Sequence, residues 1–297
     1  MTTDTPLGKS KDKKPKSDAV KAPKTERVQS FDLGPLKALI PEFPEFRSER
    51  AMAFDLERKE ALNREMMADD ELAQAVLYVW PKASDTLVVL FRGIGRKGAG
   101  LPKRRWGNLF QSGVNVLVLN DNSRCFYGRG VELFGTGVDP TLEFIRKLQQ
   151  ALGCTKLLTL GSSAGGSGAL SYGVKLGADK ILAFSPVTAV KASFYESRDL
   201  KAPDSERVVK RWRRLERLMK PADQFDCREV IQASGTKSRI RVHYPTGLYW
   251  DRMWGENLQG LPQVELFAHD DVAEHSLLNE AGEQSIAAAE IESFLLA

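Results

Sequence analysis

Seven short apolar runs constrain the fold of this 297-residue chain most strongly. They occupy residues 74–81, 85–93, 114–121, 156–161, 180–186, 239–245 and 263–270. Helix-compatible stretches lie between most of them, including Thr141–Leu152 and Gly166–Leu176. Near-continuous apolar strands that alternate with helices are typical of a mostly parallel sheet covered on both faces. We therefore predict an α/β fold with a central, mostly parallel sheet flanked by helices on both faces.

The region before the third run carries two further predictions. Residues 46–67 have helix-forming composition, with apolar residues three and four apart, and are predicted to be helical. The runs "AQAVLYVW" and "DTLVVLFRG" are separated only by "PKAS", which is a hairpin-like connection. We therefore expect the first two strands to form an antiparallel edge of the sheet.

Two segments depart from the alternation of strands and helices. Residues 1–30 are rich in Lys, Ser, Thr and Pro and are predicted to be a disordered basic tail, followed by one domain over 31–297. A helical insert is expected after the sixth strand, over about residues 187–236. Its helix 205–220 has an apolar side formed by Val208, Trp212, Leu215 and Met219, and six Lys/Arg after Val209. This helix is either a lid or basic surface for an acidic ligand, or a charged surface helix that rests one face on the core.

The charge and cysteine content restrict the classes of function. The tail holds eight Lys/Arg and four acids, which accounts for the net charge of +4 and leaves a neutral body with 35 residues of each sign. We therefore expect no nucleic-acid partner for the folded body. The chain has three cysteines, Cys125, Cys154 and Cys227, with no paired spacing and no CxxC motif. This pattern indicates free thiols in a reducing compartment. With no secretory signal and no apolar run long enough to span a bilayer, the chain is predicted to be cytoplasmic.

The stretch "KLLTLGSSAGGSGALSYG", residues 156–173, carries the strongest chemical signal. A serine held on a sharp strand-to-helix turn needs small residues two positions before and after it, and Gly161 and Gly165 occupy those positions around Ser163. Ser162 is the competing register, but Leu160 fits poorly as its small neighbour. The spacing favours Ser163 as a nucleophile, whereas the alternative is glycines that only pack a helix closely on the sheet.

A nucleophilic serine needs a base and an acid, which follow it along the chain in this type of fold. His275 lies in a loop before a predicted helix and is the favoured base, with His269 as the alternative; His243, inside a strand, is expected to be structural. Asp251 is the favoured acid, and its alternative role is a helix N-cap. Glu256 is the next carboxylate of that loop. Asp121 is the alternative acid, but it lies upstream of the serine, which favours a role in ordering loops around the site.

The loop "RGIGRKGAG" after the second run is expected to complete the site. The backbone N–H groups of Ala164 and Ile94 are predicted to form an oxyanion hole, with Gly93 and Gly95 allowing close approach of a substrate and Arg92 available to contact it. The same glycines match G-x-G-x-x-G, but Pro102 and Gly107 leave only a late, short helix after them, which disfavours a dinucleotide site. We predict no metal and no cofactor.

Together these residues resemble the α/β-hydrolase superfamily over about residues 70–297. The segments "LNDNSRCFYGRGV", "LGSSAGGSGALSYGVKLGADKILAFSP" and "WDRMWGENL…H" look like a bacterial hydrolase-like group that often occurs alongside polysaccharide synthesis. The resemblance is strongest over residues 120–186 and implies Ser163 as nucleophile, with Asp251 and His275 matching the acid and the base.

The resulting hypothesis is a serine hydrolase acting on an ester, thioester or amide, for which an acylated carbohydrate or a small ester is the candidate substrate. Two alternatives stay open at this point. One is a catalytically idle, hydrolase-like binding or scaffolding protein for an anionic glycan or nucleic acid, suggested by the basic tail and helix. The other is an acyltransferase that uses the same three residues to pass an acyl group to an acceptor hydroxyl. The oligomeric state has no sequence signal.

Overall fold

The computed structural model describes residues 52–53, 75–79, 84–94, 109, 112–196, 205–270, 272–275, 277 and 286–297. The predicted tail, residues 1–30, lies outside these described residues. Within the described part, no helix has the length and apolar character needed to cross a membrane. Cys125, Cys154 and Cys227 are all buried free thiols.

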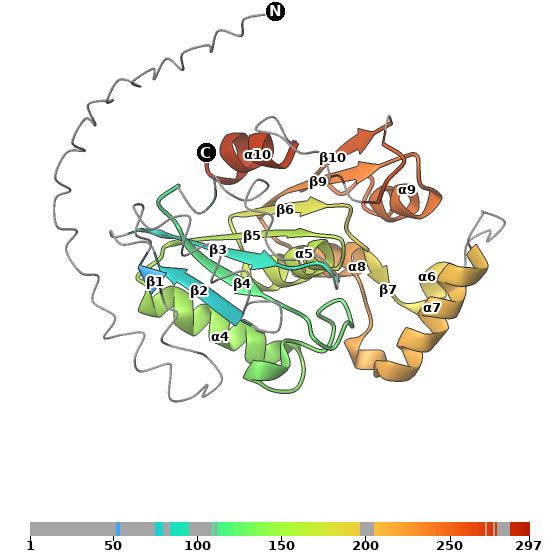
Figure 1. The fold of residues 1–297 in the computed structure, drawn as a ribbon, viewed down its shortest axis with the longest axis horizontal. Coiled ribbons are helices and arrows are strands. Elements are labelled where there is room, and N and C mark those ends of the chain that lie inside the picture. Colours follow the sequence, from blue (N-terminus) through green and yellow to red (C-terminus); the bar gives the residue numbers. More distant parts are fainter. Residues whose placement is uncertain are drawn as a thin grey trace, which may run out of the picture.

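The centre of the protein is an eight-stranded sheet in the order β1-β2-β4-β3-β5-β6-β9-β10 (Figure 1). Its strands are β1 Met52–Ala53, β2 Ala75–Val79, β3 Thr86–Phe91, β4 Asn115–Leu119, β5 Lys156–Ser162, β6 Lys180–Phe184, β9 Arg239–Pro245 and β10 Val264–His269. The strands from β4 through β10 in this order pair in parallel, and β2 pairs antiparallel with β4. All seven predicted runs form strands, and the expectation of a mostly parallel sheet is confirmed.

Two expectations for the first strands are wrong. β2 does not form a hairpin with β3, because β4 lies between them, with Leu77 opposite Leu117 and Val89 also opposite Leu117. The six residues of β3 are all buried, and such a strand needs a partner on each side, which β4 and β5 provide. Met52 and Ala53, expected in a helix, instead form β1, which pairs with Tyr78 and Val79 of β2. The rest of the predicted helix lies outside the described residues.

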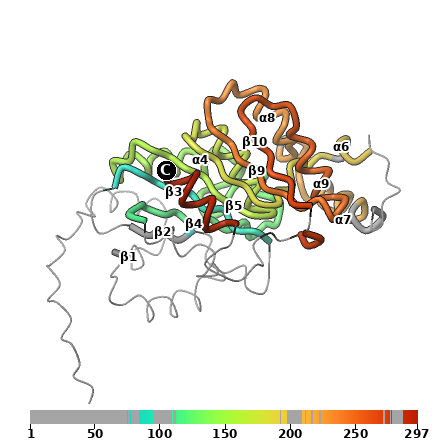
Figure 2. Tube along the Cα trace, turned by 90° about the horizontal axis from the view of Figure 1, so that it is seen from above, coloured from blue at the N-terminus to red at the C-terminus, as the bar shows by residue number. Residues whose placement is uncertain are grey.

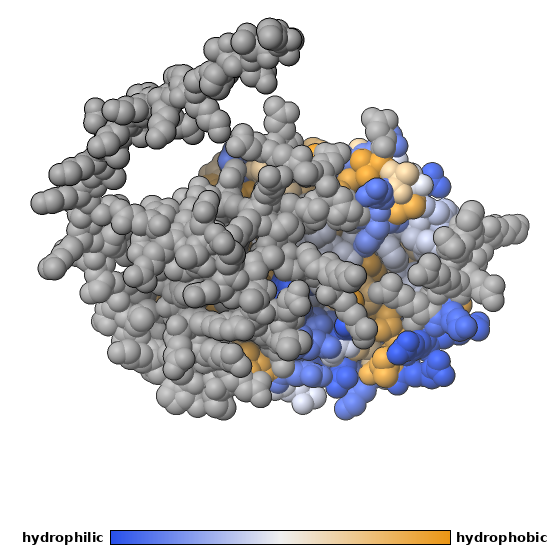
Figure 3. All heavy atoms as spheres, in the orientation of Figure 1, coloured by the Kyte–Doolittle hydropathy of each residue, from blue (hydrophilic) through white to orange (hydrophobic). Residues whose placement is uncertain are grey.

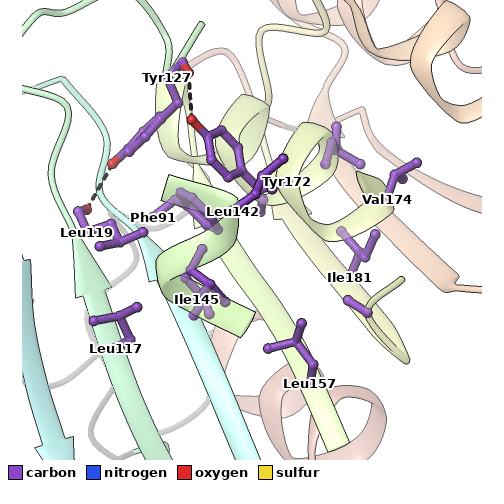
Figure 4. Close-up of a cluster of buried hydrophobic side chains, with 14 of the residues drawn as sticks. Phe91, Leu117, Leu119, Tyr127, Leu142, Ile145, Leu157, Tyr172, Val174 and Ile181 are labelled. Atoms are coloured by element: carbon purple, nitrogen blue, oxygen red, sulfur yellow. Dashed lines mark hydrogen bonds between the residues drawn. The ribbon is translucent and has the colours of Figure 1, made fainter. Parts of the chain in front are cut away.

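Alternate residues of the strands enter two separate cores. Leu87, Val89 and Phe91 of β3 face a core that also contains residues of α4 Val138–Ala151, α5 Ala164–Leu176 and α8 Cys227–Ser234. Figure 4 shows part of this core, with the Tyr127 hydroxyl bonded to Leu119 and the Tyr172 hydroxyl bonded to Tyr127. Val88 and Leu90 face the opposite core, which is covered by α10 Ile286–Glu290 and the π-helical segment Ile291–Leu295. Helices therefore cover both faces, as predicted.

The predicted insert, residues 187–236, lies between β6 and β9, so it follows the fifth of the seven predicted strands and not the sixth. It contains β7 Ala189–Val190, α6 Ala192–Glu196, α7 Ser205–Leu218, the short 3-10 helix Pro221–Asp223, β8 Phe225–Asp226 and α8. β7 and β8 pair antiparallel in a separate two-stranded sheet, which the sequence did not predict. Cys227 and Ile231 of α8 belong to the main core, so the part that stands apart from the sheet is β7 through β8. Figures 1 and 2 place α6, α7 and α9 Tyr249–Glu256 at the same end of the molecule, toward which the parallel strands point.

Candidate active site

Ser163 lies on a sharp turn between β5 and α5. Its backbone has φ 56° and ψ −123°, a positive φ that is uncommon for a residue other than glycine. The Ser163 N–H donates to the Phe184 carbonyl of β6 at 2.9 Å, and its carbonyl accepts the Ser167 N–H at 3.2 Å. The strand, turn and helix expected around this serine are therefore present, with the side chain at the carboxyl end of the sheet and the start of a helix.

The two glycines that flank the turn have no room for a side chain. A Cβ at Gly161 would lie 2.1 Å from the Gly165 carbonyl oxygen, and a Cβ at Gly165 would lie 2.0 Å from the Phe91 carbonyl oxygen. Both obstructing atoms are backbone and cannot swing aside. The glycines two positions before and after Ser163 therefore let the turn close and let α5 approach the end of β3.

Ser163, His275 and Asp251 form a continuous hydrogen-bond chain. The Ser163 Oγ lies 2.8 Å from His275 Nε2, and His275 Nδ1 lies 2.7 Å from Asp251 Oδ1. An ionised carboxylate only accepts hydrogen bonds, so His275 Nδ1–H donates to Asp251. In that tautomer Nε2 carries a lone pair, and it accepts the hydroxyl proton of Ser163.

Asp251 lies in the first turn of α9, and its side chain is 3% exposed. Burial raises the pKa of this carboxyl, and the hydrogen bond and charge of His275 partly oppose that rise. The N-cap of α9 is Leu248, so the alternative capping role of Asp251 is not observed. Glu256, the second carboxylate considered, pairs with Arg252 at 4.0 Å at the far end of the same helix.

Backbone hydrogen bonds connect the segment before His275 to the residues that follow β9. The Thr246 N–H donates to the His269 carbonyl at 3.1 Å, and the Gly247 N–H donates to the Val272 carbonyl at 3.2 Å. The Trp254 ring of α9 meets the His275 ring nearly edge-on, with the ring centres 6.4 Å apart. Asp251 and His275 are thus both positioned from the C-terminal strands, across the site from the serine turn.

The other two histidines contact each other. His243 Nδ1 lies 3.1 Å from His269 Nε2, and the His243 ring is stacked against Phe184 and Phe267. His243 is 2% exposed, and burial together with the nearby His269 and Arg241 lowers its pKa to about 3. His243 is therefore a core residue, as expected, and the alternative base His269 is engaged by His243.

Asp121 organises the loop after β4. Its carboxylate accepts the Tyr127 N–H at 2.9 Å and the Ser123 hydroxyl, and burial raises its pKa. Three residues of this loop, Arg124, Phe126 and Tyr127, have positive φ, a conformation that these local bonds hold in place. The Tyr127 hydroxyl then donates to the Arg92 carbonyl at 2.8 Å. Asp121 therefore orders a loop beside the site, and Tyr127, which no sequence signal marked, holds the chain just after β3.

The loop after β3 lies against the serine turn. A Cβ at Gly93 would be 3.0 Å from the Ser162 carbonyl oxygen and 3.6 Å from the Ser163 Cβ. Ala164 is the first residue of α5 and is fully buried, and Ile94 is a partly buried neighbour of the same apolar cluster. The Arg92 N–H donates to the Leu119 carbonyl at 2.9 Å. Gly95 lies outside the described residues.

Ala164 belongs to an apolar cluster that is rich in aromatic residues, most of them from the insert and α9. The rings of Tyr195 and Trp212 are stacked with centres 4.4 Å apart, and the Trp254 indole N–H donates to the Tyr195 hydroxyl at 3.0 Å. Trp212 and Trp250 are more than nine-tenths buried, and among the described residues neither indole N–H has a hydrogen-bond partner. The insert therefore forms an apolar wall beside the residue that follows Ser163. Within the described part of the chain, no group of three or more His, Cys, Asp or Glu side chains has a metal-binding arrangement.

Comparison with known proteins gives matches only among solved structures. No family model and no curated protein matches the sequence. The capsule O-acetyltransferase of Neisseria meningitidis serogroup A aligns at 17% identity over 69% of this chain and 86% of its own, with a TM-score of 0.48. An S-formylglutathione hydrolase from Agrobacterium tumefaciens aligns at 15% identity over 69% of this chain and 84% of its own, with a TM-score of 0.44. The monoacylglycerol lipase of Paleococcus ferrophilus aligns at 15% identity over 75% of this chain and 97% of its own, with a TM-score of 0.43.

The architecture of the chain itself is more informative than these remote similarities. Six parallel strands form most of the sheet, and β1 and β2 run antiparallel to them. A serine follows a central strand on a G-x-S-x-G turn that opens a helix. A carboxylate and a histidine follow that serine in the order that this architecture uses. The protein has the α/β-hydrolase fold.

Proposed function

We propose that the protein is a serine hydrolase that cleaves a small ester through Ser163, His275 and Asp251. The observation that carries this proposal is the continuous hydrogen-bond chain from the Ser163 Oγ through both nitrogens of His275 to Asp251. A serine hydroxyl is a weak nucleophile unless a base takes its proton, and a base is effective when a third group orients it. The serine, the base and the orienting carboxylate of this proposal come from the same end of the sheet.

The reaction follows from this geometry. The Ser163 Oγ attacks the substrate carbonyl carbon while His275 Nε2 takes the hydroxyl proton, and Asp251 stabilises the imidazolium that forms. His275 then returns the proton to the leaving alcohol as the C–O bond breaks, which leaves an acyl group on Ser163. Water, activated by the same nitrogen, attacks this acyl group and restores the free serine while the acid leaves.

We assign the oxyanion hole to the backbone N–H groups of Ala164 and Ile94. Ala164 opens α5, so its N–H is one of the donors that a helix start leaves without an intrahelical partner. The chain after β3 approaches the turn at Gly93, and this closeness supports the next residue, Ile94, as the second donor. Gly93, Gly95 and Arg92 are proposed to contact the substrate from this loop. No metal or cofactor has a part in this mechanism.

The test is hydrolysis of p-nitrophenyl acetate and butyrate by the purified protein and by two matched variants. His275→Ala removes the proposed base, whereas His269→Ala removes the other histidine at this end of the sheet. We expect His275→Ala to lower kcat by about 10³-fold or more, because the residual rate comes from the oxyanion hole and binding alone. The His269→Ala variant is expected to keep most of the wild-type rate. Equal rates for wild type and His275→Ala would refute the assignment of the base.

A further inference from the structure

α7 has one apolar face and one charged face. Trp212 and Met219 are each 4% exposed and Leu215 is 9% exposed, and all three belong to the cluster that contains Ala164. Trp212 also lies against Phe126, with the ring centres 5.6 Å apart. The buried face therefore holds the helix at the end of the sheet where Ser163 lies, and the expected apolar side is confirmed at these three positions.

The opposite face of α7 is strongly basic. Its spacing of three and four residues places the cations in one row along the helix. The exposed cations are Lys210, Arg213, Arg214 and Arg217, with Lys220 just after the helix end. Among the ion pairs between described side chains, none includes any of these five. Figure 3 shows hydrophilic residues gathered over this part of the molecule.

Few acids accompany this basic row. The sequence of α7 holds two acids, Glu206 and Glu216, against six Lys/Arg. Asp223 follows the helix, and its carboxylate accepts the Lys220 backbone N–H at 3.1 Å. With six cations against two acids, α7 carries a net positive charge, which fits an anionic partner.

An exposed leucine accompanies the cations. Leu218 is 54% exposed and is the one large apolar side chain exposed among the described residues. It follows Arg217 directly and lies one helical turn after Arg214, at the border of the basic row. An isolated exposed leucine is ordinary by itself, but here it lies beside the basic row of α7.

These features favour a lipid surface over a nucleic acid. We propose that the outer face of α7 is a docking surface for a membrane that contains anionic lipids. A row of cations on one projecting helix contacts a flat anionic surface along its whole length, and Leu218 adds an aliphatic group that fits between lipid headgroups. Proteins that bind single-stranded nucleic acid use exposed aromatic side chains, and the aromatic residues of α7 and its neighbours are buried.

The direct test is sedimentation of the full chain with phosphatidylcholine vesicles that contain about 30% phosphatidylserine. The variant combines Lys210→Gln, Arg213→Gln, Arg214→Gln and Arg217→Gln, and we expect its vesicle partition coefficient to fall by about 100-fold or more. The matched control places four Gln substitutions in the basic tail, at Lys9, Lys11, Lys13 and Lys14, and is expected to lose far less. Partition of the α7 variant within about threefold of wild type would overturn the proposal, as would loss of binding in the tail variant alone.

A second variant separates lipid from other polyanions. Leu218→Gln is expected to lower vesicle partition by about fivefold and to leave the affinity for heparin unchanged. Binding of the wild type to heparin but not to the vesicles would overturn the proposal in favour of a polyanion surface. Binding to vesicles of phosphatidylcholine alone at the same strength would also overturn it. Circular dichroism and thermal unfolding check that the variants keep the fold, as expected for exposed positions.

Discussion

The two halves of the candidate active site are held together in different ways. The serine turn, residues 161–165, is packed so closely that an added Cβ would overlap backbone, at Gly161 with the Gly165 carbonyl and at Gly165 with the Phe91 carbonyl. The acid–base half, formed by α9 and residues 272–275, is fixed by side-chain contacts and a few hydrogen bonds to the end of β9. The closely packed turn has no room for an added atom. In the acid–base half, by contrast, each side-chain contact that is removed lowers the stability of the protein by a limited amount. The two halves should therefore respond very differently to small substitutions.

The largest effect is expected from one methyl group in the serine turn. Gly165→Ala places its Cβ against the Phe91 carbonyl, so we expect the free energy of unfolding to fall by about 3 kcal/mol or more, with loss of esterase activity. Gly177→Ala is the matched control at the other end of α5, where φ is +68° and nothing lies within 4 Å of an added Cβ. It should cost only about 1–2 kcal/mol, from the left-handed backbone. Denaturant unfolding measures both, and equal losses would contradict the steric account of the turn.

The acid–base half should lose activity without losing the fold. Asp251→Asn is expected to lower kcat by about 10⁴-fold, because the amide no longer holds His275 in the required tautomer. Burial raises the pKa of Asp251, so ionising this carboxyl in the folded protein costs stability as the pH rises through its folded value. The asparagine variant lacks that cost. Its unfolding free energy relative to wild type should therefore grow between about pH 3.8 and neutral pH, and a constant difference across this range would contradict the assignment.

His243 lets the stability of the C-terminal strands be tested separately from the chemistry. Its pKa is lowered to about 3, mainly by burial, so the folded protein keeps it neutral while the unfolded chain takes up a proton below about pH 6.5. Wild type should lose up to about 1.4 kcal/mol per pH unit as the pH falls from about 6.5 toward 4. His243→Phe, between Phe184 and Phe267, should show a shallower slope, with measurements at pH 8 separating the packing change. An unchanged acid slope would show that other groups dominate it.

The smallest effect concerns Trp254, which contacts the His275 ring and donates a hydrogen bond to Tyr195. Trp254→Phe removes the hydrogen bond to the Tyr195 hydroxyl, and we expect a loss of about 1 kcal/mol beyond the loss from the smaller ring. Trp250→Phe, one turn earlier in α9, is the control because its indole N–H has no partner in the part of the chain that the structure describes. Esterase activity should fall a few-fold for Trp254→Phe alone. Equal unfolding free energies for the two variants would show that the hydrogen bond contributes nothing.

The sequence predicted these two halves unequally, for a physical reason. The steric demand of the turn appears directly as Gly161 and Gly165, so the spacing of small residues alone favours Ser163 over Ser162. His275 and Asp251 followed only from chain order and loop position, and His269 and Asp121 were open alternatives. Tyr127 and Trp254 gave no signal, because their roles depend on which distant segments meet them. The prediction of a β2–β3 hairpin was wrong for the same reason, because the insertion of β4 between them depends on tertiary contacts that the local sequence does not encode.

The identity of the nucleophile is the central claim, and covalent labelling tests it most directly. The wild type, Ser163→Ala and Ser162→Ala are each treated with a fluorophosphonate probe, and the modified residue is identified by peptide mass spectrometry. Ser162 is the matched control because it precedes Ser163 on the same turn. The account predicts a single modified peptide with the probe on Ser163, retained in Ser162→Ala and absent in Ser163→Ala. Labelling that persists in Ser163→Ala, or that is found on another residue of the wild type, would contradict it.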